Sequence, residues 1–413
     1  MSSRLITAFV SILPLASAWL PGHHSSIELS AFGVTNRSIA GRQTIVVPDK
    51  IRGVNVGSLF IIEPWMVGES WNRIGCSNQP SEFACVQQLG QEAANSAFRQ
   101  HWDTWITQGE IQLMKDYGLN TIRIPIGYWM AEDLVRGDEH YPKGGLQFLD
   151  RFVGWAADAG MYVILDLHGG PGVQAANQGF TGNTVSEPQF FNSYNFDRAY
   201  GFLEFMTSRI HNPSTAQQYR SVGMLQVMNE PDRGYGNLVS EFYPNTLRRI
   251  RDRETQLNVA DAARLHVQFM NTNWGAGRPA QNLPADDMLF FDSHTYFSFE
   301  NSKEQSQQSY LTSSCAAQPG SDGDAPVVVG EWSVGINANA GGNGEFEVNS
   351  DNNLEFYRQY YGRQVGNFEK LAGWIFWSWK TEAGNDFRWS YKTAVERGIF
   401  DKDPGNAAAN YGC

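Results

Sequence analysis

Short apolar runs recur along the chain, and each is followed by a polar or glycine- and proline-containing stretch and then by a longer segment with helical spacing. This alternation is typical of parallel strands joined by crossover helices. Eight runs are predicted to be strands, at residues 51–57, 120–127, 161–169, 223–229, 264–270, 288–294, 326–332 and 372–379. Eight strands close a (β/α)8 TIM barrel, so an α/β fold of this kind in a single domain is the prediction.

Two of the intervening segments show the helical period clearly. Between residues 145 and 160, the apolar side chains at 146, 149, 152, 153 and 156 fall on one face. Those at 202, 203, 205, 206 and 210 do the same within residues 196–210. Such an apolar stripe is expected to cover a sheet.

Polar and aromatic residues lie in or just after most of the predicted strands. If the strands form a barrel, their C-terminal ends meet at one mouth. Each residue also has an ordinary structural explanation, since Asn-Glu-Pro can be a turn and a single histidine can be part of the core. Their coincidence at one end of a barrel favours a site. The candidates are Glu63, Arg123, His168, Asn229, Glu230, His294, Tyr296, Glu331 and Trp377.

Glu230 and Glu331 have the placement that glycoside hydrolysis requires. One carboxylic acid protonates the leaving oxygen, while the other, as carboxylate, attacks the anomeric carbon or activates water. Asn229 can bind a sugar hydroxyl without adding charge, and Arg123 is expected to lower the pKa of Glu331. A retaining mechanism predicts carboxyl groups about 5 to 5.5 Å apart.

Five motifs in the same order resemble glycoside hydrolase family 5 and cover residues 52–382: RGVNVGSLFIIEPWM, LDLHGGPG, VMNEP, VVGEWS and FWSWKTE. The resemblance implies that Glu230 is the acid/base and Glu331 the nucleophile of a retaining β-glycanase. It implies that Arg123, His168, Asn229, His294, Tyr296 and Trp377 line the sugar subsite at the cleaved bond. Glu63 matches a carboxylate that contacts the non-reducing end in exo-acting relatives.

Within this family the motifs are most similar to the secreted fungal glucanases, which include exo-β-1,3-glucanases and endo-β-1,6-glucanases. Ser58 and Leu59 replace a glycine and a tryptophan usual in the exo-β-1,3 enzymes. Residues 72–85 and 180–190 look more similar to the endo-β-1,6 enzymes. The resemblance therefore favours β-1,6-glucan as substrate, with exo-β-1,3-glucanase as the alternative.

Other functions fit the sequence less well. The chain has no G-x-S-x-G elbow for an α/β-hydrolase and no G-x-G-x-x-G after a strand for a dinucleotide. A carbohydrate-binding barrel without catalysis remains the non-enzymatic alternative, but both glutamates are present. No cofactor and no metal are expected.

The formal charge of −12 and the scattered lysines and arginines argue against nucleic acid or an anionic membrane as partner. Thirteen tryptophans and sixteen tyrosines instead suit a neutral ligand such as a β-glucan polysaccharide or oligosaccharide. We expect the protein to act as a monomer.

Residues 1–18 have the features of a secretory signal peptide, with Arg4 before an apolar stretch and small residues before the expected cleavage site. The glycoside hydrolase domain would then be residues 19–413, secreted and extracellular. Asn36 begins a glycosylation sequon.

Four cysteines, Cys76, Cys85, Cys315 and Cys413, would meet an oxidising environment and are expected to form disulfides. Three pairings are possible. The closeness of Cys76 to Cys85 favours a local bridge, which leaves Cys315 for Cys413, and no zinc-type spacing supports a metal site.

Overall fold

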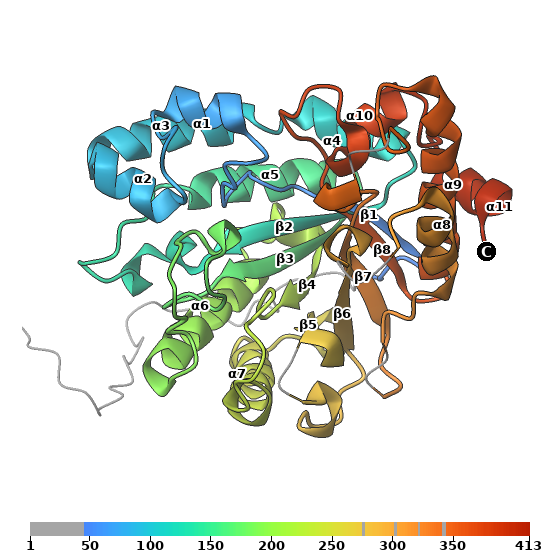
Figure 1. The fold of residues 1–413 in the computed structure, drawn as a ribbon. Helices are drawn as coiled ribbons and strands as arrows, with labels where there is room; N and C mark the ends of the chain where they lie inside the picture. The colour runs from blue at the N-terminus through green and yellow to red at the C-terminus, as the bar shows by residue number, and fades with distance from the viewer. Residues whose placement is uncertain (1–44, 275–276, 301–303, 321–322, 341–343) are drawn as a thin grey trace, which may run out of the picture. The chain divides into compact units, whose positions relative to one another are not determined.

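Eight parallel strands form a closed barrel in the order β1 to β8, as the sequence predicts (Figure 1). The computed structural model describes residues 45–274, 277–300, 304–320, 323–340 and 344–413. The strands are β1 (Ile51–Asn55), β2 (Thr121–Gly127), β3 (Tyr162–Gly169), β4 (Val222–Gln226), β5 (His266–Met270), β6 (Leu289–Thr295), β7 (Val327–Trp332) and β8 (Gly373–Phe376).

Helices surround the barrel, and the two predicted from their apolar stripes, α5 and α6, are confirmed (Figure 1). The helices are α1 (Gly68–Ile74), α2 (Glu82–Leu89), α3 (Gln91–Thr104), α4 (Gln108–Asp116), α5 (Leu146–Asp158), α6 (Ser193–His211), α7 (Tyr243–Gln256), α8 (Gln307–Ala316), α9 (Asp351–Phe368), α10 (Tyr391–Glu396) and α11 (Pro404–Tyr411). None of the helices in the described ranges is long and apolar enough to cross a membrane.

The strands β4 and β8 end three residues earlier than predicted. After Gln226 the chain leaves the regular ladder, because the backbone N–H of Val227 bonds to Gln268 on one side and that of Asn229 bonds to Leu167 on the other. The apolar run continues beyond the strand, so hydrophobicity alone overestimates its length.

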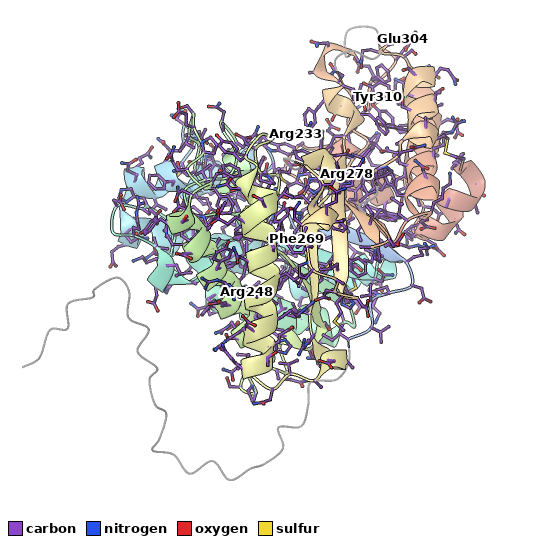
Figure 2. All side chains as sticks on the ribbon, turned by 90° about the horizontal axis from the view of Figure 1, so that it is seen from below. Arg233, Arg248, Phe269, Arg278, Glu304 and Tyr310 are labelled. Atoms are coloured by element: carbon purple, nitrogen blue, oxygen red, sulfur yellow. A yellow bond between two sulfur atoms is a disulfide. The ribbon has the colours of Figure 1, made fainter. Side chains whose placement is uncertain are left out.

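Two apolar cores hold the barrel. The larger one fills the space between the strands and the helices, where Phe269 of β5 lies among the side chains drawn in Figure 2. The smaller one, here called the lower layer, lies inside the barrel near the strands' N-terminal ends and consists of Ile51, Tyr162, Ile164, Met224, Phe290, Val328 and Ile375. Because side chains alternate along a strand, residues two positions further on form the next layer inside the barrel.

The expected disulfide pairing is confirmed. Cys76 bonds to Cys85 and fastens the segment between α1 and α2, while Cys315 of α8 bonds to Cys413 at the end of the chain. The predicted signal peptide of residues 1–18 and the sequon at Asn36 lie outside the described residues.

Candidate active site

A cavity of about 930 Å³ opens at the C-terminal ends of the strands. This is the end at which barrels of this kind assemble their sites. Eight of the nine candidate residues line it: Glu63, His168, Asn229, Glu230, His294, Tyr296, Glu331 and Trp377. The ninth, Arg123, does not line it.

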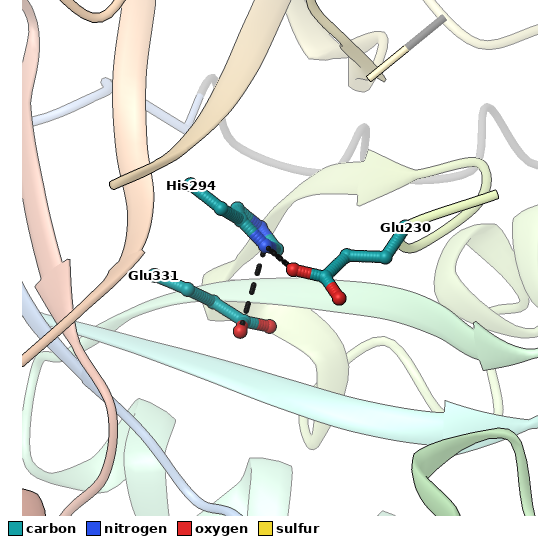
Figure 3. A group of neighbouring side chains, drawn as sticks. All are labelled: Glu230, His294 and Glu331. Carbon is teal, nitrogen blue, oxygen red and sulfur yellow. Dashed lines mark hydrogen bonds and ion pairs between the residues drawn. The ribbon is translucent and has the colours of Figure 1, made fainter. Parts of the chain in front are cut away.

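The two glutamates approach the same nitrogen of His294 (Figure 3). The imidazole Nδ1 lies 2.6 Å from Glu230 Oε1 and 3.5 Å from Glu331 Oε2. One oxygen of each carboxyl group and one nitrogen of the imidazole all lie within 4.8 Å of one another. The hydroxyl of Tyr296 donates a hydrogen bond of 2.9 Å to Glu331 Oε2. The two carboxyl groups are therefore close enough to act on the same bond.

Arg123 lies beneath the cavity, with none of its surface exposed. Its guanidinium donates to Glu331 Oε1 at 2.9 Å and to the side-chain oxygen of Asn229 at 2.8 Å. The expectation that Arg123 lines the sugar subsite therefore differs from the structure. A side chain on the third residue of β2 ends below the mouth, so Arg123 can act on a ligand only through the residues that it holds.

Electrostatics in the site centre on His294. Burial alone would lower the pKa of its imidazole, but the carboxylates of Glu331 and Asp292 and the hydrogen bonds to Asp292 and Glu230 raise it to about 10. Burial also raises the pKa of Glu331, and the charges of His294 and Arg123 oppose this rise. Arg123 thus opposes the rise as expected, but the net pKa of Glu331 is raised because loss of solvent outweighs the nearby guanidinium.

Asn229 and Trp377 both line the cavity, Asn229 with a polar amide and Trp377 with an aromatic ring. Since the Asn229 side-chain oxygen accepts from Arg123, its amide nitrogen is left to donate to a ligand. The Trp377 indole stacks on the His168 imidazole at 5.6 Å between ring centroids with 8° between the planes. His168 Nδ1 in turn lies 2.6 Å from Asp166 Oδ2, which fixes the orientation of the stack.

Glu63 lines the cavity beside Trp65. Burial raises the pKa of Glu63 to about 7, while the charge of His168 and the hydrogen bond from the Trp65 indole lower it. That hydrogen bond measures 2.9 Å. The carboxyl group is therefore held in place and changes its charge near neutral pH.

Local irregularities of the backbone turn three of these side chains toward the mouth. The register between β6 and β7 shifts so that Ser293 pairs with Val329 and His294 with Glu331, which leaves one extra residue in β7. A similar shift between β2 and β3 leaves His168 as the extra residue. Glu230 has a φ of 37°, in the left-handed region that is strained for a residue with a side chain. Bulges and strained residues of this kind commonly redirect side chains at functional sites.

Sequence reasoning missed much of the aromatic wall of the cavity. Trp65 and Phe299 are 52% and 69% exposed, and they contact Trp389, which also lines the cavity. Trp274 lies further along the lining, where its ring meets that of His294. Trp65 follows the first predicted strand two residues after Glu63, but it is not among the nine candidates. The other three lie in short 3-10 turns after strands, and the sequence carried no signal for them beyond its high aromatic content.

Glu230, His294 and Glu331 are close enough together to be considered as ligands of a metal ion. The donor set does not fit one well. Both ring nitrogens of His294 already face carboxylates, and a histidine with a pKa of about 10 carries a proton on each nitrogen at neutral pH. A protonated imidazole has no lone pair for a metal.

A closed (β/α)8 barrel with two glutamates close together at its mouth is the arrangement typical of barrel glycoside hydrolases. The family model described as "Cellulase (glycosyl hydrolase family 5)" matches residues 86–383. The chain belongs to glycosyl hydrolase family 5.

Curated relatives match over nearly the whole chain. The chain is 44% identical over 408 residues to "Glucan endo-1,6-beta-glucosidase B" of Emericella nidulans, covering 97% of each protein. It is 29% identical to "Probable glucan 1,3-beta-glucosidase A" of the same organism, covering 85% of this chain and 90% of that one. Among solved structures, the rutinosidase from Aspergillus niger has a similar fold, with a TM-score of 0.69 at 19% identity, covering 86% of this chain and 99% of that one.

Proposed function

We propose that this protein is a retaining endo-β-1,6-glucanase that cleaves β-1,6-glucosidic linkages in β-glucan by double displacement. The observation that carries the proposal is the approach of Glu230 and Glu331 to within 4.8 Å through one oxygen of each. Retaining enzymes hold their carboxyl groups about 5 to 5.5 Å apart, whereas inverting enzymes leave 6.5 to 9.5 Å for a water molecule. The close approach supports retention.

In the proposed reaction, Glu331 attacks the anomeric carbon and forms a covalent glucosyl ester. Glu230 gives a proton to the departing glycosidic oxygen as that bond breaks. Glu230 then takes a proton from a water molecule, whose oxygen attacks the anomeric carbon and releases Glu331. Arg123 and Tyr296 each donate a hydrogen bond to Glu331 and would keep its two oxygens in position.

The linkage is proposed from the relatives. The relative named for endo-1,6 action is 44% identical to this chain, and the one named for 1,3 action is 29% identical. Exo-β-1,3-glucanase therefore stays the second candidate. The specific observation that favours it is the buried Glu63 in the cavity lining, since Glu63 matches a carboxylate that contacts the non-reducing end in exo-acting relatives.

Product analysis on linear β-1,6-glucan and β-1,3-glucan, side by side, tests the proposal. We expect gentio-oligosaccharides of several lengths from the first and little release from the second. Glucose alone from the β-1,3-glucan would assign the protein to the second candidate. Reducing-sugar release by the wild type, absent in Glu230→Gln, separates both enzymes from a non-catalytic barrel that only binds carbohydrate.

Azide rescue tests the roles of the two glutamates. With an aryl β-glucoside as substrate, Glu331→Ala with azide is expected to give the α-glucosyl azide, because azide replaces the nucleophile and attacks once. Glu230→Ala with azide is expected to give the β-glucosyl azide, because azide attacks the covalent intermediate. The opposite stereochemistry in the two variants would reverse the assignment.

We also propose that the protein is secreted after removal of residues 1–18. Two disulfides support an oxidising destination. The N-terminal sequence of the protein from the culture medium tests this, and it is expected to begin at Trp19. A protein retained in the cells with Met1 at its start would contradict it.

A further inference from the structure

An Asp-x-His sequence occurs twice at the mouth of the barrel, once on β3 as Asp166 and His168 and once on β6 as Asp292 and His294. Both aspartates are fully buried, so neither can touch a substrate. Each accepts a contact from the histidine two residues later, at 2.6 Å on β3 and 3.2 Å on β6. The two pairs differ in what the other side of the imidazole meets.

On β6, the imidazole joins two carboxyl groups. His294 Nε2 faces Asp292 Oδ2, and Nδ1 faces Glu230 Oε1 at 2.6 Å. On β3, the imidazole of His168 stacks on Trp377 and has no bond to either glutamate among the described residues. The Asp292–His294 pair therefore contacts Glu230, the residue proposed as the acid/base. The Asp166–His168 pair instead contacts the Trp377 ring.

Resting on the proposed function, we propose that Asp292 is a positioning residue for proton transfer by Glu230. Asp292 accepts the Nε2–H of His294, which turns Nδ1 toward Glu230. The bond from Nδ1 then fixes Oε1 of Glu230 and leaves Oε2 to exchange the catalytic proton with the substrate. Figure 3 shows this second oxygen directed away from His294.

The surroundings hold Asp292 in the position that this role requires. Its Oδ1 accepts the backbone N–H of Gly330 at 2.8 Å, and its Oδ2 lies 3.8 Å from the guanidinium of Arg123. A Cβ at residue 330 would lie 2.1 Å from Oδ1, so only glycine leaves room for the carboxylate.

The charged groups that face His294 come from three parts of the chain. Asp292 is on its own strand, Glu230 follows β4, and Glu331 is on β7 at 3.5 Å from Nδ1. The Trp274 ring covers the imidazole from the segment after β5. Of the two glutamates, Glu230 is 0.9 Å closer to Nδ1, the difference between 3.5 and 2.6 Å, which makes it the partner that Asp292 positions.

The test compares Asp292→Asn with Asp166→Asn on two substrates. Linear β-1,6-glucan needs protonation of its leaving oxygen, whereas a 2,4-dinitrophenyl β-glucoside has a leaving group that departs without it. For Asp292→Asn, we expect kcat/KM to fall on the order of 100-fold on the glucan, within the range of general acid catalysis, and less than about 5-fold on the aryl glucoside. Asp166→Asn is the control, because Asp166 has the same motif and the same burial, although it lies closer to the Arg123 guanidinium, at 3.0 Å against 3.8 Å for Asp292. For this variant, both substrates should lose activity by the same factor.

Loss of the same factor on both substrates in Asp292→Asn, or the same selectivity in Asp166→Asn, would overturn the proposal. Failure of the proposed function looks different, because the wild type itself would then not hydrolyse linear β-1,6-glucan. Long-range ¹H–¹⁵N spectra of the wild type give a readout that needs no stable Asp292 variant. With His294 assigned by its loss in His294→Gln, we expect a protonated Nε2, and an unprotonated Nε2 would overturn the proposal.

Discussion

Inside the barrel, two neighbouring layers of side chains have the same burial and opposite chemistry. The lower layer is apolar and includes Ile164, Met224 and Phe290. Two residues further along the same three strands lie Asp166, Gln226 and Asp292, which are as deeply buried. We call these, with Asn55 of β1 and Arg123 of β2, the upper layer. Side chains in the lower layer therefore pack against one another, whereas those in the upper layer form hydrogen bonds and ion pairs.

Arg123 links the polar groups of the upper layer, although Asp166 Oδ1 has no hydrogen-bond partner among the described residues. Arg123 donates to Asn55 at 2.8 Å and to Gln226 at 2.7 Å, and its guanidinium lies 3.0 Å from Asp166. Burying charge without such partners would cost several kcal/mol for each group. The Arg123 guanidinium thus allows Asp166 and Asp292 to be buried directly beneath the site. There they bind His168 and His294, which apolar side chains could not do.

Arg123→Met should have the largest effect, because it removes the charge and keeps much of the volume. Asp166, Asp292 and Glu331 would be left buried without their common cation. We expect the free energy of unfolding to fall by about 3 to 5 kcal/mol and kcat/KM on β-1,6-glucan to fall on the order of 10³-fold. Urea unfolding and initial rates measure the two losses. A variant with wild-type stability would show that the upper layer does not depend on its cation.

Ile164→Ala should break the lower layer and leave the site intact. Cavities of this kind cost about 2 to 5 kcal/mol, and Ile164→Val should cost about 1 kcal/mol as the matched control. Because no residue of the lower layer lines the cavity, kcat/KM should stay within about 2-fold of the wild type at a temperature where the variant is folded. A large loss of activity in the folded variant would mean that the two layers are not separable.

The sequence predicts the lower layer better than the upper one. Runs such as those around Ile164 and Phe290 place eight strands correctly, and their C-terminal ends place Glu230, His294 and Glu331 at one mouth. This works because burial of apolar side chains follows a simple period along each strand.

The features that the sequence did not predict depend on contacts between residues that are far apart in the chain. Glu331 faces the mouth only because β7 carries an extra residue, which a strict period of two cannot foresee. The depth of Arg123 and the role of Asp292 depend on strands that are far apart in sequence. The pKa of Glu331 depends on burial, which a list of neighbouring charges leaves out.

Glu82 of α2 lies outside the barrel and differs from the carboxylates of the upper layer. It is fully buried, but it has no cation among its hydrogen-bond partners. Burial raises its pKa to about 8, opposed by the hydrogen bond from the Ile62 N–H. Its folded pKa is raised above the unfolded value, so its stabilising contribution is full below pH 4.5 and is lost as the pH rises through about 8.

Glu82→Gln should therefore remove part of the loss of stability at high pH. Since one unit of pKa corresponds to about 1.4 kcal/mol and the folded carboxyl stays neutral for about three pH units after the unfolded one has ionised, we expect the variant to gain on the order of 4 kcal/mol over the wild type between pH 5 and pH 9. Thermal unfolding of both proteins across this range gives the measurement. Parallel curves for the two proteins would show that Glu82 does not change its protonation in the folded state.

Metal removal should have the smallest effect, because the upper layer already supplies the charges that the site uses. Both nitrogens of His294 face carboxylates, and its pKa of about 10 keeps a proton on each of them at neutral pH. Exhaustive treatment with EDTA should thus leave kcat/KM unchanged within error at pH 6 to 7. A loss restored by one divalent ion, and absent in His294→Gln, would show that His294 binds a metal and is not held as a cation between Asp292 and Glu230.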